Sequence, residues 1–155
     1  MTIGPDEHTR YELDSALPPE TVIATLVDFS ERRRFIWRET CHPKVYRVDG
    51  LGDTWAEVTE GVPYAWSRER YEWSEPNTVS LRQLDSNIAI PGGTIEYRVT
   101  PNSSGGSHIV CERRRHFRGF NGRLLGTLMV VLGPAILRRQ LEAGLRRAGG
   151  QLGPA

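Results

Sequence analysis

The sequence predicts an α+β fold in which a seven-stranded antiparallel sheet wraps around one long C-terminal helix. Three observations support this prediction. Side chains alternate with a period of two over most of residues 44–116, short turn-forming segments separate the alternating runs, and the uncharged apolar segment Leu124–Leu137 follows them. Short connections favour antiparallel neighbours, because parallel strands need long crossovers. A single helix after such strands can bury its apolar side against the concave face of the sheet.

The N-terminal part is predicted to hold one strand and two short helices. Residues 1–8 look like a loose lead-in, and Thr9–Leu17 alternates as a first strand. Proline suits the first turn of a helix, so Pro18-Pro19 marks the start of a short helix. Ser30 is a favourable N-cap for a second short helix, which is expected to reach Trp37.

Six further strands are expected from residue 44 onward. Their predicted spans are Lys44–Asp49, Thr54–Glu60, Ala65–Trp73, Val79–Leu84, Gly93–Thr100 and Ser107–His116. The separators are rich in glycine, proline, asparagine and serine, which are the residues that turns require. No internal repeat or change of composition divides the chain, so we expect a single domain over residues 1–155 with a structured core of about residues 9–148.

The long C-terminal helix has a weak point in its middle. Pro134 removes the N–H that would bond the carbonyl of residue 130, and Gly133 weakens the same turn. We therefore expect a kink, which either follows the curvature of the sheet or gates a cavity.

The same helix raises the question of a membrane span. The segment Leu124–Leu137 has 14 residues without a charge, whereas a membrane-spanning helix needs about 20. A buried core helix is the better interpretation. The leucines expected to pack into the sheet are Leu124, Leu128, Leu132 and Leu137.

Composition and charge exclude several classes of protein. A chain of 155 residues with 38% hydrophobic and 25% charged residues can form one globular domain with a sizeable core. The net charge of +1 provides no broad positive field for nucleic acid. Two cysteines are too few for a disulfide framework, and the first residues lack the pattern of a signal peptide, so we expect a cytoplasmic protein.

Strand parity predicts which side chains face the helix. From Ala65 onward, odd-numbered strand positions carry most apolar and aromatic side chains, and even-numbered positions carry many of the charges. Odd-numbered positions should therefore point inward. Together with flanking aromatic residues and the long helix, this predicts a ligand-binding set of Trp37, Trp55, Glu69, Tyr71, Trp73, Tyr97, Arg113, Arg115, Leu128 and Leu132.

Two arginines of this set allow two interpretations. Arg113 and Arg115 could hold a carboxylate, phenolate or enolate oxygen of a ligand, because a guanidinium binds such groups through charge-assisted hydrogen bonds. They could equally pair with Glu57, Glu69 or water near the end of their strand, since structural ion pairs are common.

Other kinds of site receive little support. The chain has no Gly-x-Ser-x-Gly elbow and no phosphate-binding glycine loop. The adjacent pair Cys41-His42 lacks the usual spacing of metal ligands, so no metal site is predicted. His116 could act as a base, or it could be an exposed histidine at a strand end.

The order of these patterns resembles the START-like (Bet v 1-like, SRPBCC) superfamily, in particular its bacterial polyketide cyclase/dehydrase branch. The resemblance is carried by Leu17–Val22 leading to Asp28-Phe29, by Tyr71–Pro76, by Gly93–Pro101, and by the last strand with its long helix. It implies a helix-grip fold with an internal cavity for a lipid, polyketide, isoprenoid or other apolar molecule. It implies no fixed set of catalytic residues, because fold alone does not determine function.

Three functions remain open from the sequence. The leading one is binding of a small hydrophobic or aromatic molecule in the internal cavity. The second is a cyclase or dehydratase that promotes an aldol step, with Tyr71, Tyr97, Arg113 or Arg115 moving a proton or stabilising an enolate. The third is a protein-interaction domain of the co-chaperone kind. We expect a small hydrophobic ligand, no nucleic acid, no integral membrane segment, no cofactor, and a monomer or homodimer.

Overall fold

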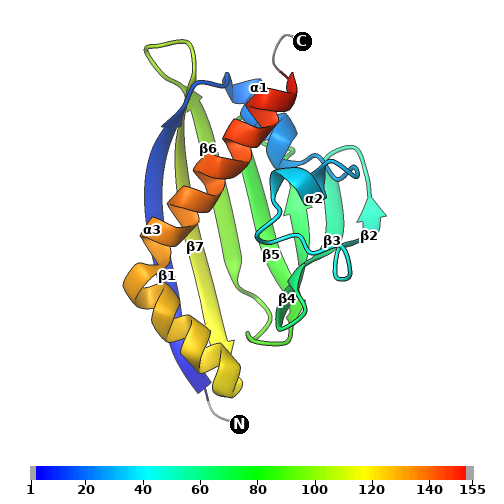
Figure 1. Cartoon of the computed structure of the whole chain (residues 1–155), viewed down its shortest axis with the longest axis vertical. Helices are drawn as coiled ribbons and strands as arrows, with labels where there is room; N and C mark the ends of the chain where they lie inside the picture. Colours follow the sequence, from blue (N-terminus) through cyan, green and yellow to red (C-terminus); the bar gives the residue numbers. More distant parts are fainter. Residues whose placement is uncertain (1–2, 153–155) are drawn as a thin grey trace.

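The computed structural model describes residues 3–152 and shows one open sheet crossed by a long helix (Figure 1). The elements in chain order are β1 (Ile3–Ser15), α1 (Pro19–Leu26), α2 (Arg33–Ile36), β2 (Arg47–Leu51), β3 (Trp55–Val62), β4 (Ala65–Glu72), β5 (Thr78–Ser86), β6 (Thr94–Pro101), β7 (Ser107–Arg118) and α3 (Gly119–Leu152). The predicted helix-grip architecture is confirmed.

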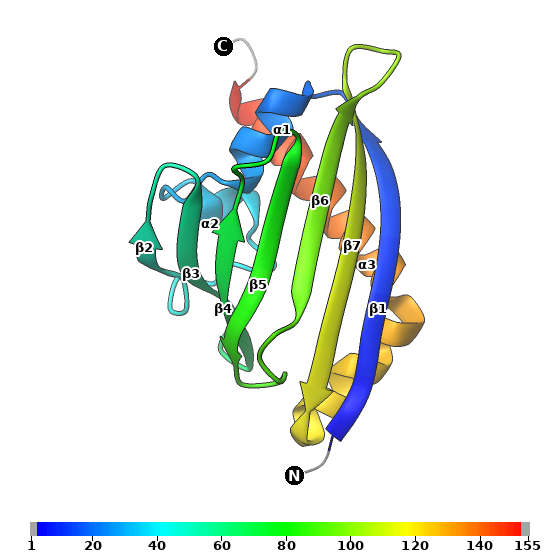
Figure 2. The same cartoon turned by 180° about the vertical axis from the view of Figure 1, so that it is seen from behind.

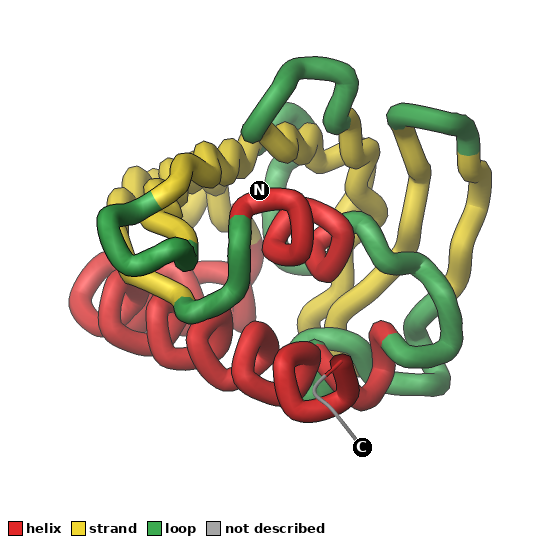
Figure 3. Tube along the Cα trace, turned by 90° about the horizontal axis from the view of Figure 1, so that it is seen from above, coloured by secondary structure: helices red, strands yellow, loops and turns green. Residues whose placement is uncertain are grey.

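The sheet has the order β1-β7-β6-β5-β4-β3-β2, and every neighbouring pair is antiparallel. The consecutive strands β2 to β7 form a meander, as their short connections require. β1 pairs with β7, which brings the first and last strands side by side. Figure 2 shows the outer face of this sheet without a covering helix, and Figure 3 shows the sheet curving around the helices.

The helices cover the inner face unevenly. α3 packs mainly on β1 and β7, whereas α1 lies against β5 and β6, and α2 contacts α3. The main core cluster contains Leu13, Val22, Val99 and Leu141 and lies between these layers. Because α3 lies over β1 and β7, the inner face of β4 and β5 is left to line the space beneath it.

Burial follows the predicted parity in β5, β6 and β7. Val79, Ile95 and Ile109 occupy odd-numbered positions and are buried. In β3 the buried apolar residues are the even-numbered Ala56 and Val58, and the buried Thr59 hydroxyl pairs with Asp49 of β2. Inward positions thus have opposite parity in β3, a strand for which no parity was predicted.

The first strand begins earlier than the sequence suggested. β1 starts at Ile3, so the prediction of a loose lead-in over residues 1–8 is wrong for the part that the structure describes. Glu7 and Thr9 are buried in this strand, and the Thr9 hydroxyl donates a hydrogen bond to Glu7 Oε2 across 2.7 Å. An inward carboxylate breaks the apolar alternation by which a strand is detected in a sequence.

The helix α3 is also longer than predicted, and its phase differs. It begins at Gly119, directly after β7, and continues to Leu152. The predicted packing of Leu124, Leu128 and Leu132 into the sheet is wrong, because these side chains are 59%, 44% and 48% exposed. Leu137 does pack against the core.

Glycines take the place of those leucines against the sheet. Gly122, Gly126 and Gly133 are buried on the inner side of α3, together with Met129. A Cβ on Gly126 would lie 2.7 Å from the ring of Phe117, which shows how closely the helix approaches the end of β7. Small residues permit this approach, and the partly exposed leucines lie away from this contact.

The outer side of the first half of α3 is apolar. Its exposed large hydrophobic residues are Phe120, Leu124, Leu128, Val130, Val131 and Leu132. By length and composition, Gly119–Gly150 could cross a membrane, with a mean hydropathy of 1.5 and 22% of the apolar window buried. One such helix is weak evidence for a span, because core helices of soluble proteins meet the same criteria. Figure 1 shows the helix axis changing direction in the part that contains Pro134.

Candidate ligand-binding cavity

A cavity of about 370 Å³ lies between the sheet and α3. Aromatic and aliphatic side chains from the sheet and the helix line it, among them Tyr11 of β1, Leu81 of β5, Ile95 of β6 and Leu141 of α3. Ligand pockets typically measure about 300–1,000 Å³ and are mostly apolar with a few convergent polar groups. The volume and the lining of this cavity fit that description.

Most of the predicted ligand-binding residues line this cavity. They are Trp37, Glu69, Tyr71, Tyr97, Arg113, Arg115 and Leu128. All except Trp37 and Leu128 occupy odd-numbered strand positions, so the parity of β4, β6 and β7 brings them together.

Three predicted residues lie elsewhere. Trp55 has the outward parity of β3, and the Arg70 guanidinium lies 4.6 Å from its ring centroid on the outer face. Trp73 follows the end of β4 and packs on Phe29, with ring centroids 6.0 Å apart, rather than on the cavity. Leu132 is exposed because α3 turns its glycine side to the sheet. The wall of this cavity therefore contains none of these three residues.

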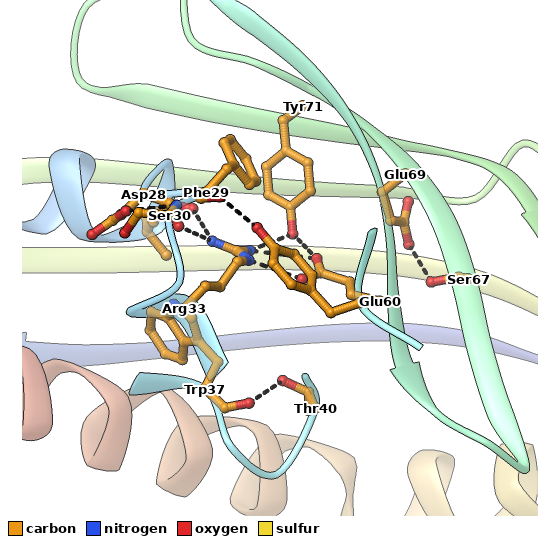
Figure 4. Close-up of polar contacts among 12 residues, drawn as sticks. Asp28, Phe29, Ser30, Arg33, Trp37, Thr40, Glu60, Ser67, Glu69 and Tyr71 are labelled. Carbon is orange, nitrogen blue, oxygen red and sulfur yellow. Dashed lines mark hydrogen bonds and ion pairs between the residues drawn. The ribbon is translucent and has the colours of Figure 1, made fainter. Parts of the chain in front are cut away.

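Arg33 organises a closed polar network at one side of the cavity (Figure 4). Its Nε donates to Glu60 Oε2 across 2.9 Å, and its Nη2 donates to Glu60 Oε1 at 3.4 Å and to the Tyr71 hydroxyl at 2.9 Å. Its Nη1 donates to the carbonyls of Leu26 and Asp28 at 3.0 and 3.1 Å. Tyr71 in turn donates to Glu60. All five N–H donors of this buried arginine thus have acceptors.

The protonation states of Arg33 and Tyr71 in this network are set by burial and by Glu60. Burial opposes the charged form of Arg33, but the neighbouring Glu60 carboxylate outweighs burial and raises the arginine pKa. Burial, reinforced by Glu60, raises the pKa of Tyr71 well above its usual value. The network therefore holds a protonated guanidinium and a neutral phenol at neutral pH. Sequence reasoning missed Arg33 and Glu60, because nothing in Arg32-Arg33-Arg34 marks the middle arginine as the buried one.

A second polar cluster lies on the cavity-facing side of the sheet and consists of Glu69 on β4, Gln83 on β5 and Arg115 on β7. Arg115 Nη2 donates to Glu69 Oε1, which also accepts a hydrogen bond from the Ser67 hydroxyl at 3.0 Å. Gln83 lies beside Glu69, since the two residues are paired across β4 and β5. Of the two interpretations of Arg115, the structure shows the pairing with Glu69.

Burial dominates the electrostatics of this second cluster. Glu69 and Arg115 are 2% and 4% exposed. Burial raises the pKa of the Glu69 carboxyl despite the Arg115 charge, and burial lowers the pKa of Arg115 despite Glu69. Among the described residues, Glu69 Oε2, Arg115 Nη1 and Gln83 Oε1 have no hydrogen-bond partner.

Arg113 lies next to this cluster on the same face of β7. Its Nε donates to the buried Glu7, at 3.2 Å from Oε1 and 3.1 Å from Oε2. This ion pair with Glu7 orients the guanidinium, and Arg113 lines the cavity. The buried Glu7 that orients Arg113 lies in the segment that was predicted to be a loose lead-in.

The described residues offer no metal site, since no group of three or more His, Cys, Asp or Glu side chains within residues 3–152 is placed to hold a metal ion. His116 is exposed at its strand end, where Nδ1 lies 2.7 Å from Asp6 Oδ1. It does not line the cavity, so the structure favours the exposed histidine over the base.

Solved structures share this architecture at low sequence identity. The Zhui aromatase/cyclase from Streptomyces sp. R1128 aligns with a TM-score of 0.70 and 17% identity, over 95% of this chain and 93% of that one. A START superfamily protein from Mycobacterium smegmatis aligns with a TM-score of 0.72 and 12% identity, over 94% of this chain and 99% of that one. Norcoclaurine synthase from Thalictrum flavum, in complex with dopamine and hydroxybenzaldehyde, aligns with a TM-score of 0.64 and 10% identity. The alignment covers 94% of this chain and 88% of that one. At these identities the likeness shows the fold.

Sequence comparison identifies the family. No curated protein matches the chain significantly. The family described as polyketide cyclase / dehydrase and lipid transport matches residues 7–149, which include every strand pairing beyond the first residues of β1 and nearly all of α3. The chain therefore belongs to the polyketide cyclase / dehydrase and lipid transport family.

Proposed function

We propose that this protein binds a small hydrophobic or aromatic molecule, of the lipid, polyketide or isoprenoid class, in the cavity between the sheet and α3. The observation that supports this most directly is the cavity of about 370 Å³, whose apolar wall contains a few buried polar side chains. Its volume lies near the lower end of the usual range for ligand pockets, which favours a compact ring molecule over a long acyl chain. A cytoplasmic location and a monomeric or dimeric state form part of the same proposal.

A cavity-filling variant tests this proposal. Leu137 lines the cavity from α3, so Leu137→Trp should fill part of the space that a ligand would occupy. The probe is 1-naphthol, titrated by its own fluorescence, with circular dichroism as a check of folding. We expect saturable binding to the wild type and a loss of at least about tenfold in affinity in the variant.

Leu124→Trp is the matched control, because Leu124 lies on the exposed side of the same helix and does not line the cavity. It should bind 1-naphthol as the wild type does. No binding to the wild type, or equal binding by Leu137→Trp, would contradict the proposal. Native mass spectrometry of the protein purified from its own host would reveal a co-purified ligand directly.

A second candidate function is a cyclase or dehydratase. One observation favours it: Glu69 is a buried carboxylate in the cavity wall with a free Oε2 and a pKa raised by burial, which are properties of a general base. Glu69 would remove a proton from a carbon between two carbonyls, and the resulting enolate carbon would attack a second carbonyl carbon. This C–C bond closes the ring, the new alkoxide would take the proton back from Glu69, and loss of the hydroxyl with a hydrogen of the neighbouring carbon, as water, would form a double bond in the ring. Arg113, which also lines the cavity, would stabilise the enolate oxygen.

Conversion of a linear tetraketide thioester, followed by liquid chromatography and mass spectrometry, tests the enzymatic function. Glu69→Gln should abolish the formation of the dehydrated ring while 1-naphthol binding persists. Equal conversion by the variant, or by buffer alone, would exclude this role for Glu69.

A further inference from the structure

The cavity wall contains two polar clusters that differ in how fully their hydrogen-bonding groups are used. Around Arg33 every guanidinium donor has a protein acceptor. Around Glu69 the opposite holds, since three buried atoms of Glu69, Gln83 and Arg115 have no partner among the described residues. Buried polar groups in folded proteins are nearly always hydrogen-bonded, so groups left without a protein partner indicate a ligand or solvent partner. Figure 4 shows Glu69 and its Ser67 bond apart from the Arg33 network.

Trp37 Nε1 is a further unpartnered donor in the cavity wall, but only around Glu69 do three such atoms belong to one cluster, and these three define a chemical pattern. Arg115 Nη1 is a donor, whereas Glu69 Oε2 and Gln83 Oε1 are acceptors. All three side chains line the cavity, and each is at most 4% exposed. A single hydroxyl group can donate to Glu69 and accept from Arg115, while the amide oxygen of Gln83 requires a second donor. Two hydroxyl groups on one ring match this set.

The charges around the cluster are balanced. Arg113 pairs with Glu7, and Arg115 pairs with Glu69, so two positive charges face two negative ones. An ionised carboxylate would bring an uncompensated negative charge close to Glu69 in a buried site, which is unfavourable. The acidic ligand considered from the sequence for these arginines is therefore the less suitable one.

We infer that Glu69, Gln83 and Arg115 form the polar subsite of the cavity and bind a neutral, dihydroxylated ring. This inference rests on the proposed function, because it specifies the class of ligand that the cavity takes. One hydroxyl lies between Glu69 and Arg115, and the other donates to Gln83. The Arg33 network, which is already complete, shapes the wall without binding the ligand's polar groups.

A ligand series on one ring system tests the inference. The probes are naphthalene, 1-naphthol, 1,3-dihydroxynaphthalene and 1-naphthoate, titrated with the wild type near pH 7. Each added hydroxyl should strengthen binding by about tenfold, the effect of one well-formed hydrogen bond in a buried site. 1-Naphthoate, which is ionised at this pH, should bind more weakly than 1-naphthol.

Gln83→Leu removes the second acceptor at nearly constant size. It should erase the preference for 1,3-dihydroxynaphthalene over 1-naphthol and keep the preference for 1-naphthol over naphthalene. Arg82→Leu is the matched control, because Arg82 precedes Gln83 on β5, is exposed and does not line the cavity. It should leave all the affinities within about twofold of the wild-type values.

The outcomes separate the two proposals. If the wild type binds naphthalene and both hydroxylated probes equally, or if it prefers 1-naphthoate, the polar subsite is wrong and the hydrophobic cavity stands. If none of the probes binds, the proposed binding function itself is wrong. If Gln83→Leu does not fold, the wild-type series still decides between these results.

Discussion

Gly126 of α3 lies directly against the ring of Phe117 in β7, so closely that a Cβ on the glycine would come within 2.7 Å of a ring atom. It would also lie 2.9 Å from Pro5 of β1. This close approach holds the first half of α3 on β1 and β7. The opposite half of the sheet is consequently free to line the cavity.

The first prediction concerns this contact. Gly126→Ala should destabilise the fold by about 1–3 kcal/mol, the usual cost of overpacking a tight site, even though alanine favours helix. Chemical denaturation would measure it. Gly150→Ala is the matched control, since no atom lies within 4 Å of a Cβ placed there. This change should stabilise the helix by up to about 1 kcal/mol. A Gly126→Ala variant as stable as the wild type would show that the close packing is not maintained in solution.

The same helix shows what the sequence could not reveal. The fold class was predictable because period-two alternation and short turns leave few other architectures. The phase of α3 was not, because Leu124, Leu128 and Leu132 suggest an inward stripe, whereas glycines permit the closer approach that decides the packing. Apolar periodicity measures which residues avoid water and does not measure how near two backbones can come.

The candidate site was likewise predictable in part. Parity placed Glu69, Tyr71, Tyr97, Arg113 and Arg115 at the cavity. Trp55 was chosen as an aromatic residue without a parity argument, and it lies outside the cavity because the inward positions of β3 are even-numbered. Gln83 has inward parity as well, but a single glutamine carries no sequence signal until the structure shows that its oxygen lacks a partner.

The second prediction concerns the closed network. Arg33→Lys should destabilise the fold by about 2–5 kcal/mol, because a lysine cannot reach Glu60, Tyr71 and the Leu26 carbonyl together, and each buried acceptor left unpaired costs about 1–3 kcal/mol. Denaturation of the neighbouring Arg34→Lys gives the comparison. Arg34 pairs with the exposed Glu31, so its replacement should cost less than about 1 kcal/mol. Equal losses in the two variants would show that Arg33 is not held as described.

The third prediction concerns the two thiols. Cys41 and Cys111 are each 1% exposed, and burial raises the pKa of Cys41 to about 12 and that of Cys111 to about 11. The thiolate is the reactive form, so both should resist iodoacetamide at pH 8 in the native protein and react in denaturant. Mass spectrometry over a time course would count the labels. Rapid labelling of Cys111 in the native state would mean that the core between β1, β6 and β7 opens easily.

The fourth prediction concerns pH. His108 at the start of β7 lies 2.9 Å from Asp14 Oδ1 and 3.2 Å from Glu12 Oε1, and these contacts raise the pKa of its imidazole above 6.5. A histidine with a raised pKa in the folded state stabilises the fold below its unfolded pKa, and this contribution is lost as the pH rises through the folded value. NMR titration of the ring protons should therefore give a midpoint above 6.5, and Asp14→Asn should lower it. Because His108 is exposed, added salt should reduce the shift. A wild-type midpoint at or below 6.5, or one that Asp14→Asn leaves unchanged, would show that the strand-end contacts between β1 and β7 do not form in solution.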